Sequence, residues 1–172
     1  AAAAFRPARS RAQYRLAMLL RDGSAVDRSA GMFWMQRSGE NGYDEAQFQL
    51  GLGHAAGRDL PRDPVLAARW FERAARQGHA ASQVNLGTLY ETGNGVDRDD
   101  AAAAKWYREA AEQEVSVAQI NLGSLYAQGR GVARDDRAAL HWYLRAAQSG
   151  APEAHYNLGV LYENSADLGD DR

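Results

Sequence analysis

The sequence predicts an all-α protein, an α-solenoid built from tandem antiparallel helix pairs. The segment NLGTLYETGNGVDRDDAAAAKWYREAA, residues 85–111, returns 36 residues later as NLGSLYAQGRGVARDDRAALHWYLRAA, residues 121–147. Within each copy the apolar residues follow the period of an α-helix. A helical unit that cannot bury its apolar face alone, and that recurs in series, is typical of a stacked repeat protein.

Two columns of residues fix the register of the repeat. Both columns have a spacing of 36 residues and are expected to be structural: Trp34, Trp70, Trp106 and Trp142, and Gly51, Gly87, Gly123 and Gly159. Ala17 stands 34 residues before Gly51, so the first unit lacks two residues, which we place in its loop at 23–27. We therefore expect a repeat domain over residues 9–164 between an N-terminal tail, 1–8, and a C-terminal tail, 165–172. Its four units are about 9–42, 43–78, 79–114 and 115–150, with a half-unit at 151–164.

The first segment of each unit is expected to be a helix. In 118–128 an apolar stripe begins at Ala118 and recurs at i+4, i+7 and i+8. Gly57, Gly93 and Gly129 each follow such a segment. A residue in the left-handed conformation commonly ends a helix at this position, and glycine adopts it without strain. These glycines are therefore expected to terminate the first helices.

The second helix of each unit is expected to begin at an aspartate. These residues are Asp27, Asp63, Asp99 and Asp135. A carboxylate at this position accepts hydrogen bonds from free backbone N–H groups and interacts favourably with the helix dipole. Pro64 directly follows Asp63, at the first helical position that proline favours. Farther along, tryptophan is expected to fill the space between units, while small residues such as Ala110 and Ala111 let helices approach.

Composition and charge argue against several classes of protein. The net charge of −2 gives no reason to expect a nucleic-acid partner. Cysteine is absent, which excludes disulfides and thiolate metal sites. No apolar run approaches the roughly 18 residues of a membrane span. Residues 1–40 hold seven arginines against three acids, and 150–172 hold five acids against one arginine, so the two ends could steer a charged partner.

The motifs that usually mark chemistry are incomplete. Gly93-Asn94-Gly95 and Gly129-Arg130-Gly131 lack the preceding strand and the further residues of a nucleotide-binding loop. The four histidines are scattered, without HExxH spacing: His54, His79, His141 and His155. The serines show no nucleophile elbow. We therefore expect no catalytic residue, no metal site and no cofactor.

In order, the repeated motifs Asn-Leu-Gly, Leu-Tyr, Gly-x-Gly-Val, Asp, Lys-Trp-Tyr and Ala-Ala resemble the Sel1-like repeat, a relative of the tetratricopeptide repeat. The match is fullest in 84–111 and 120–147. The second unit departs from it with Gln49 and Asp59, and the first with Ala17 and its short loop. The resemblance covers residues 9–164 and implies a right-handed superhelix of helix pairs.

The resemblance also implies a function. Such repeats act as adaptors in bacterial envelope, exopolysaccharide and signalling assemblies, in host contact and in eukaryotic protein quality control. We therefore expect a non-enzymatic scaffold with a protein or peptide partner. A cysteine-rich bacterial subgroup is linked to penicillin binding, and this chain lacks those cysteines. Two alternatives remain: a binder or hydrolase of an envelope saccharide or peptidoglycan fragment, and a structural spacer.

A helical wheel predicts where a partner binds. One face of each first helix points away from the paired helix, and we expect this face to be the concave one. It carries apolar, amide and small polar side chains that suit an extended peptide: Arg11, Tyr14, Arg15, Met18, Phe48, Gln49, Leu52, Asn85, Thr88, Asn121, Ser124, Tyr156 and Asn157. Arg21 would extend an anion-attracting end. Alternatively, the Asn column only sets helix stacking, and Val84 and Ile120 are buried between units.

The end of the sequence predicts self-association. No tryptophan-bearing second helix follows Tyr162. The half-unit therefore either caps the stack or is the start of a truncated pair. If it is truncated, Leu158, Leu161 and Tyr162 would leave an apolar face exposed. We expect that face to bring two copies together.

Overall fold

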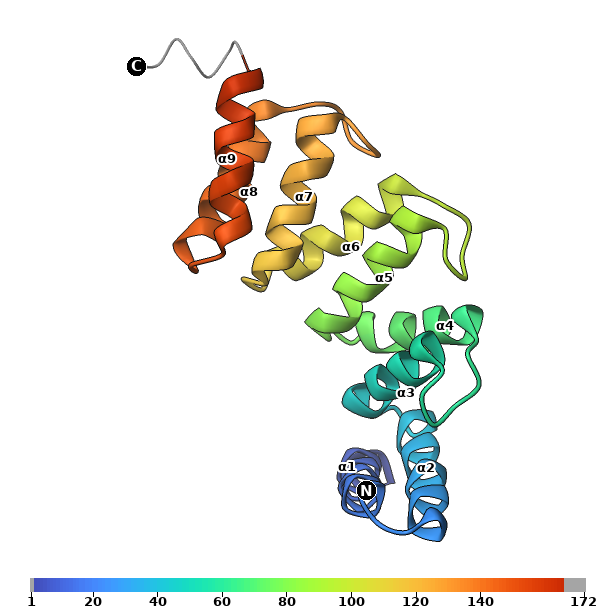
Figure 1. Cartoon of the computed structure of the whole chain (residues 1–172). Coiled ribbons are helices and arrows are strands. Elements are labelled where there is room, and N and C mark those ends of the chain that lie inside the picture. Colours follow the sequence, from blue (N-terminus) through green and yellow to red (C-terminus); the bar gives the residue numbers. More distant parts are fainter. Residues whose placement is uncertain (1, 166–172) are drawn as a thin grey trace. The chain divides into compact units, whose positions relative to one another are not determined.

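The described part of the chain is entirely helical, as the sequence predicts. The structure is a computed structural model that describes residues 2–165, with side chains from residue 8 onward (Figure 1). Within this range the elements are α1 (Ala2–Arg21), α2 (Ala25–Glu40), α3 (Asp44–Ala56), α4 (Pro64–Ala75), α5 (Ala80–Thr92), α6 (Asp100–Glu112), α7 (Ser116–Gln128), α8 (Asp136–Gln148) and α9 (Pro152–Asn164). They pack as sequential antiparallel pairs.

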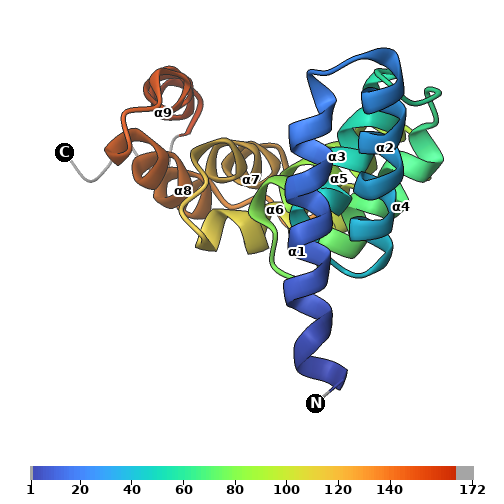
Figure 2. The same ribbon diagram turned by 90° about the horizontal axis from the view of Figure 1, so that it is seen from below.

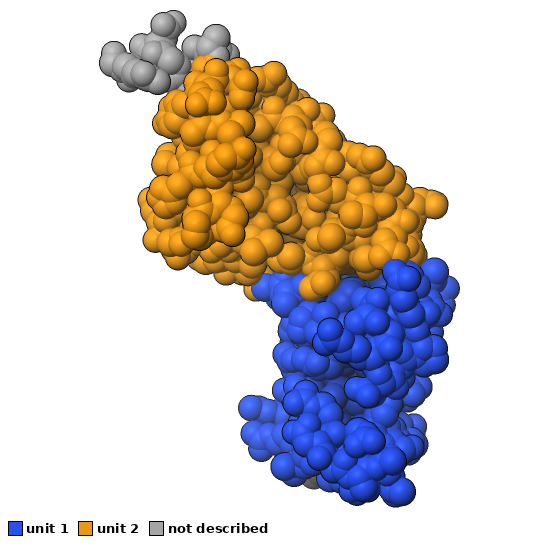
Figure 3. Space-filling model, in the orientation of Figure 1, with its two compact units in different colours: residues 1–82 blue, residues 83–172 orange. Residues whose placement is uncertain are grey.

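The chain divides into two compact units, each larger than one repeat. They are Ala1–Ser82 and Gln83–Arg172, and from here on we call them unit 1 and unit 2 (Figure 3). In unit 1, α2 packs against both α1 and α3, and α3 packs against α4. In unit 2, α7 packs against α6 and α8, and α9 packs against α8. Within each unit these helices thus pack on their neighbours in the chain, as a stacked repeat requires.

The first helix is longer than the sequence pattern predicts. Residues 2–8, expected to form a tail, belong to α1, which runs beside α2 (Figure 2). The segment opens with alanines, and alanine has the highest intrinsic helix propensity. The expected C-terminal tail lies outside the described residues, apart from Ser165.

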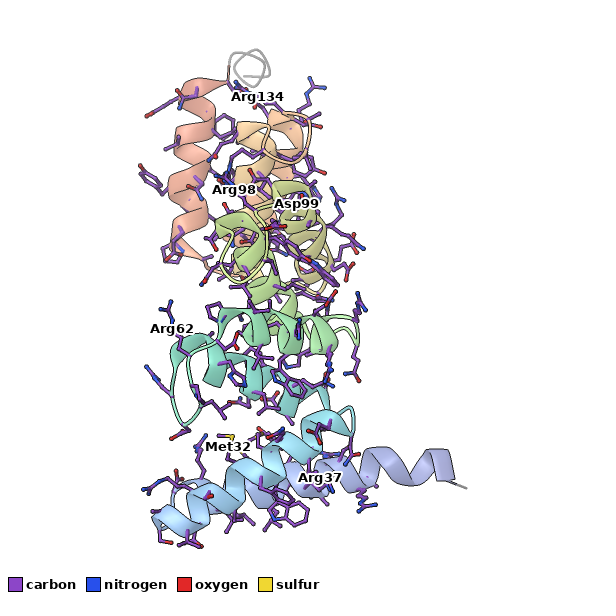
Figure 4. All side chains as sticks on the ribbon, turned by 90° about the vertical axis from the view of Figure 1, so that its right-hand side faces the viewer. Met32, Arg37, Arg62, Arg98, Asp99 and Arg134 are labelled. Atoms are coloured by element: carbon purple, nitrogen blue, oxygen red, sulfur yellow. The ribbon has the colours of Figure 1, made fainter. Side chains whose placement is uncertain are left out.

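The predicted helix ends are confirmed in most repeats. The carboxylate of Asp63 accepts from the backbone N–H of Leu66 at 2.9 Å, and Asp99 and Asp135 cap α6 and α8 in the same way (Figure 4). The first helices end at glycines with positive φ, which are Gly57 at 71°, Gly93 at 72° and Gly129 at 65°. Local chemistry therefore sets the length of each helix.

The prediction that Asp27 begins the second helix is wrong. Ser24 is the N-cap of α2, and Asp27 lies three residues into the helix. The Asp27 backbone N–H donates to Ser24 Oγ at 3.3 Å, and the Ser24 backbone N–H donates to the Asp27 carboxylate at 2.8 Å. This reciprocal arrangement is a capping box. Because the loop is two residues short, the serine starts the helix before the aspartate can.

Close contact between a glycine and an aromatic ring holds the helix pairs α3–α4, α5–α6 and α7–α8 together. A Cβ atom on Gly51 would lie 2.6 Å from the ring of Phe71, and one on Gly87 would lie 2.6 Å from Tyr107. Gly123 is related to Tyr143 in the same way, at 2.7 Å. Real Cβ atoms do not approach a ring so closely, so only glycine fits. The glycine column is a column of helix contacts.

A second column, of buried glutamines, lies on the first helices, and two of its members reach the second helix before them. The column consists of Gln13, Gln47, Gln83 and Gln119. In unit 1 the Gln47 side-chain amide donates to the Gly39 carbonyl at 2.9 Å and accepts from Gln77 at 2.7 Å. In unit 2 Gln119 donates to the Ala111 carbonyl at 3.2 Å. A buried amide that hydrogen-bonds to an adjacent helix end fixes how the two helices meet.

The tryptophans occupy equivalent, half-buried places on the second helices. Trp70 of α4 reaches the preceding second helix, where a Cβ atom on Gly39 would lie 3.3 Å from its ring. Trp142 packs against the buried cluster of α6 and α7. A cation covers the ring of three of them, for example Arg73 at 4.7 Å from Trp70. Trp70 and Trp142 therefore connect successive repeats.

We expect Gly123→Ala to destabilise unit 2, because its methyl group would collide with the Tyr143 ring. The free energy of unfolding should fall by about 1–3 kcal/mol in urea denaturation followed by circular dichroism. Gly159→Ala is the matched control, since it has the same place in the repeat but no atom within 4 Å of the position its methyl group would take. That control should raise stability by up to about 1 kcal/mol through helix propensity. Equal effects of the two changes would contradict the packing role of this column.

Candidate functional site

The aromatic residues of the predicted surface in unit 1 are partly engaged in packing. The ring of Tyr14 lies 5.1 Å from that of Tyr43. Phe48 lies 6.0 Å from Phe71 and 4.8 Å from His79, measured between ring centroids. These rings are half-buried, whereas Arg11 and Arg15 are exposed on α1. The predicted surface therefore has an apolar part, held in place by ring contacts, beside a cationic part.

A cleft opens in unit 1 between the ends of α1, α2 and α3. It consists of two cavities, of about 470 and 410 Å³, that share Arg21, Met32, Met35 and Asp59. We call the two cavities the unit-1 cleft. Its other lining residues include Met18, Arg28, Gln36, Gln49, Leu52, Arg58 and Leu60. Met32 projects from α2 toward the loop that follows α3 (Figure 4).

All three methionines of the chain line this cleft: Met18, Met32 and Met35. Methionine is unbranched and polarizable, and it adapts to irregular apolar ligands. Gln49 adds an amide, although its Nε2 also donates to Glu45 at 3.0 Å. The cleft therefore offers adjustable apolar contacts with polar groups at its edge.

The sequence predicted only part of this lining. Met18, Gln49 and Leu52 belong to the predicted surface, and Arg21 was expected beside it. Met32, Met35 and Arg58 were missed, because the wheel considered first helices only and these residues lie on α2 and in a loop. The confinement of every methionine to residues 18–35 was the available signal.

In unit 2, the polar side chains of the predicted surface serve a buried tyrosine instead. Tyr107 is fully buried, and its hydroxyl donates to the Glu91 carboxylate at 2.8 Å. Thr88 Oγ1 lies 3.1 Å from the same hydroxyl, and the Asn121 side chain also hydrogen-bonds it. Burial raises the pKa of Tyr107 well above its ordinary value, with the nearby Glu91 acting in the same direction. Thr88 and Asn121 thus stabilise helix packing.

Tyr143 has the place of Tyr107 in the next repeat and is also buried. Burial raises the pKa of Tyr143, and a hydrogen bond with Ser124 acts in the opposite direction. Unit 1 differs, because Phe71 stands in the same column and has no hydroxyl to satisfy. Leu52 accordingly replaces the Thr88 and Ser124 of the other repeats. This apolar replacement gives the unit-1 cleft one of its walls.

The remaining predicted residues are spread over α5, α7 and α9. Val84 packs against the α6–α7 cluster and Ile120 against the α8–α9 cluster, and both side chains are half-buried. Asn85 and Asn157 are half-buried. Tyr156 is 74% exposed. None of these residues lines the unit-1 cleft.

The expected apolar face of α9 differs in detail from the prediction. Leu161, expected to be exposed, is buried against Ala139 and Tyr143. Leu158 is half-buried, whereas Tyr162 is exposed as expected, together with the apolar residues Tyr156 and Val160. The helix packs on α8 through Leu161, which turns the tyrosines outward.

The histidines and acids of the described residues form no group that could hold a metal ion. His79 lies near Glu45, with Nε2 3.3 Å from the carboxylate, and its Nδ1 accepts from the Ser82 backbone N–H at 3.2 Å. The hydrogen bond between His79 and Ser82 thus caps the start of α5. None of the helices that the structure describes has both the length and the apolar character needed to cross a bilayer.

We expect Thr88 and Tyr107 to be energetically coupled. Thr88→Leu alone should lower the free energy of unfolding by about 1–2 kcal/mol, because it removes a partner of a buried hydroxyl. Combined with Tyr107→Phe, the change imitates Leu52 and Phe71 of unit 1 and should cost less than the two single changes added together. Denaturation of the three variants measures the coupling. Strict additivity would contradict a shared hydrogen-bond network.

Comparison with known proteins supports one family throughout. The Sel1 repeat family model matches residues 10–43, 44–79, 80–115, 116–150 and 152–170. A protective antigen of uropathogenic Escherichia coli with an SLR fold is 37% identical, with a TM-score of 0.83 over 89% of this chain and 33% of that chain. A Sel1 repeat protein from Oxalobacter formigenes is 30% identical, with a TM-score of 0.76 over 88% and 60%. The chain thus spans a third to three-fifths of the length of these proteins, and no curated protein matches it. On the evidence of its repeats and its fold, the chain belongs to the Sel1 repeat family.

Proposed function

We propose that this chain is a non-enzymatic adaptor that binds a segment of a partner protein on the face of its first helices, which the sequence predicts to be concave. Sel1 repeats generally mediate protein interactions. The observation that carries the proposal is the unit-1 cleft, which gathers Met18, Gln49 and Leu52 of the predicted surface. Its volume falls in the range of known ligand-binding pockets.

The lining of the cleft favours a peptide over a saccharide. A saccharide site would require aromatic rings and carboxylates, whereas this cleft holds three methionines, Leu52 and Leu60. Phe33 at its edge is its aromatic residue, and Asp59 its carboxylate, among the lining residues described. Amides such as Gln49 can both donate to and accept from a peptide backbone. The chemistry therefore suits apolar side chains on an extended peptide.

Selection of displayed peptides on the immobilised chain tests this proposal. We expect the selected peptides to bind wild type and to lose at least tenfold in affinity with Leu52→Asp, because a carboxylate in the apolar wall must be desolvated. Val117→Asp is the matched control, since Val117 is also an exposed apolar residue of a first helix. It should bind normally, and both variants should keep the helical circular dichroism of wild type. Peptides insensitive to Leu52→Asp would place binding elsewhere.

We also propose that the exposed face of α9 lets two copies associate. Tyr156, Val160 and Tyr162 are exposed there, and the space beside Gly159 is open. Tyr156→Lys with Val160→Glu should keep the chain monomeric at concentrations where wild type forms a larger species in sedimentation velocity. A wild-type chain of monomeric mass up to millimolar concentration would contradict self-association.

A further inference from the structure

An arginine closes the junction between the two complete repeats of unit 2. Arg130 follows α7 and forms an ion pair with Glu91 near the end of α5. Its Nη1 also lies 3.9 Å from the carboxylate of Asp100 at the start of α6. Gly131, with φ at +67°, brings the loop so close that a Cβ atom there would overlap the Asp100 carbonyl. The loop thus seals the junction with opposite charges.

The same positions in unit 1 hold only arginines. Counted from the glycine column, Arg58 takes the place of Arg130 and Arg21 that of Glu91. Counted from the tryptophan column, Arg28 takes the place of Asp100. Attraction across the junction is therefore replaced by repulsion between like charges.

The junction of unit 1 is accordingly open, and it is the unit-1 cleft. Arg21 and Arg28 line its larger cavity, and Arg21 and Arg58 line the smaller one. Asp59, with φ at 59°, stands where Gly131 lies in unit 2 and is the acidic residue among the lining residues described. Three guanidinium groups against one carboxylate leave the lining cationic.

The existing contacts of these arginines leave donors free. Arg28 Nη1 donates to the Gly23 carbonyl at 2.8 Å, which holds one side of that guanidinium in place. Arg21 Nε lies 3.4 Å from the Asp22 carboxylate, in an exposed pair that contributes little. A guanidinium has five N–H donors in a planar fork that matches a carboxylate. The cleft can therefore accept at least one carboxylate from a partner.

We propose, building on the peptide-binding function above, that the unit-1 cleft binds a peptide segment in which carboxylates flank a large apolar side chain. The carboxylates supply the charge that Glu91 and Asp100 supply in unit 2. The apolar side chain lies against Met18, Met32 and Leu52. The positions that hold Glu91 and Asp100 in unit 2, where they close the junction, thus hold Arg21 and Arg28 in unit 1, where they bind the ligand.

Three fluorescein-labelled peptides test the proposal by fluorescence anisotropy. They are GELELELG, its neutral analogue GQLQLQLG and its polar analogue GESESESG. We expect GELELELG to bind wild type at least tenfold more tightly than either analogue, because it alone offers both charge and apolar surface. Its affinity should fall as salt is raised, since the arginines are partly exposed to solvent.

A charge-restoring variant gives the sharper test. Arg21→Glu with Arg28→Asp rebuilds the acid pair of unit 2 opposite Arg58. We expect GELELELG to bind this variant at least tenfold more weakly, while the midpoint of thermal unfolding stays equal or rises. Arg69→Glu with Arg137→Asp is the control, because it changes the net charge equally at two exposed sites outside the cleft. At physiological salt, which screens distant charges, its affinity for GELELELG should stay within about twofold of wild type.

Several outcomes would overturn the charge proposal. These are failure of GELELELG to bind wild type, equal binding of GELELELG and GQLQLQLG, and equal loss of binding in the two double variants. Each leaves peptide binding itself standing, because the displayed-peptide selection with Leu52→Asp decides that question separately. Failure of that selection, with no peptide that depends on Leu52, would overturn both proposals.

Discussion

In the helix pairs α3–α4, α5–α6 and α7–α8, the distance between the helices depends on one contact, that of a glycine with an aromatic ring. A ring lying on the glycine brings the two helix backbones closer than a larger residue at that position would allow. Alanines of the second helices, such as Ala67 in unit 1 and Ala103 in unit 2, are then fully buried. Because each pair still has an apolar flank, another pair must follow. Repetition is thus a consequence of how little surface a single pair can bury.

Buried polar side chains use partners in their own or an adjacent repeat, and this limits where a ligand can bind. Buried glutamines reach the carbonyls and amides of an adjacent helix end, and Tyr107 uses Thr88, Glu91 and Asn121. A junction closed by such hydrogen bonds and ion pairs has little to offer a partner. Departures from the repeat pattern are therefore the informative positions. They concentrate in unit 1, where the loop is short, Leu52 replaces a hydroxyl and arginines replace acids.

The sequence predicted the architecture well, because register, helix ends and close contacts are local or strictly periodic. Gly57 ends a helix whatever surrounds it, and the tryptophan spacing specifies the repeat without knowledge of its partners. The start of α2 was mispredicted, since Ser24 and Asp27 compete for the cap and only the loop geometry decides. Only part of the cleft's lining was predicted, because a helical wheel considers one helix at a time, whereas Met32 and Arg58 reach the cleft from different elements. The wheel also misses the role of Thr88, which depends on a tyrosine 19 residues away.

The central claim is that a ligand binds where the first two repeats fail to close. The chain contains three methionines, and all of them line that cleft, so their methyl groups form a built-in set of reporters. Carbon-13-labelled methionine methyls should give three signals in a two-dimensional NMR spectrum. Titration with a peptide selected on the chain should shift all three signals along one binding curve. A peptide that binds without moving any of them would contradict the account.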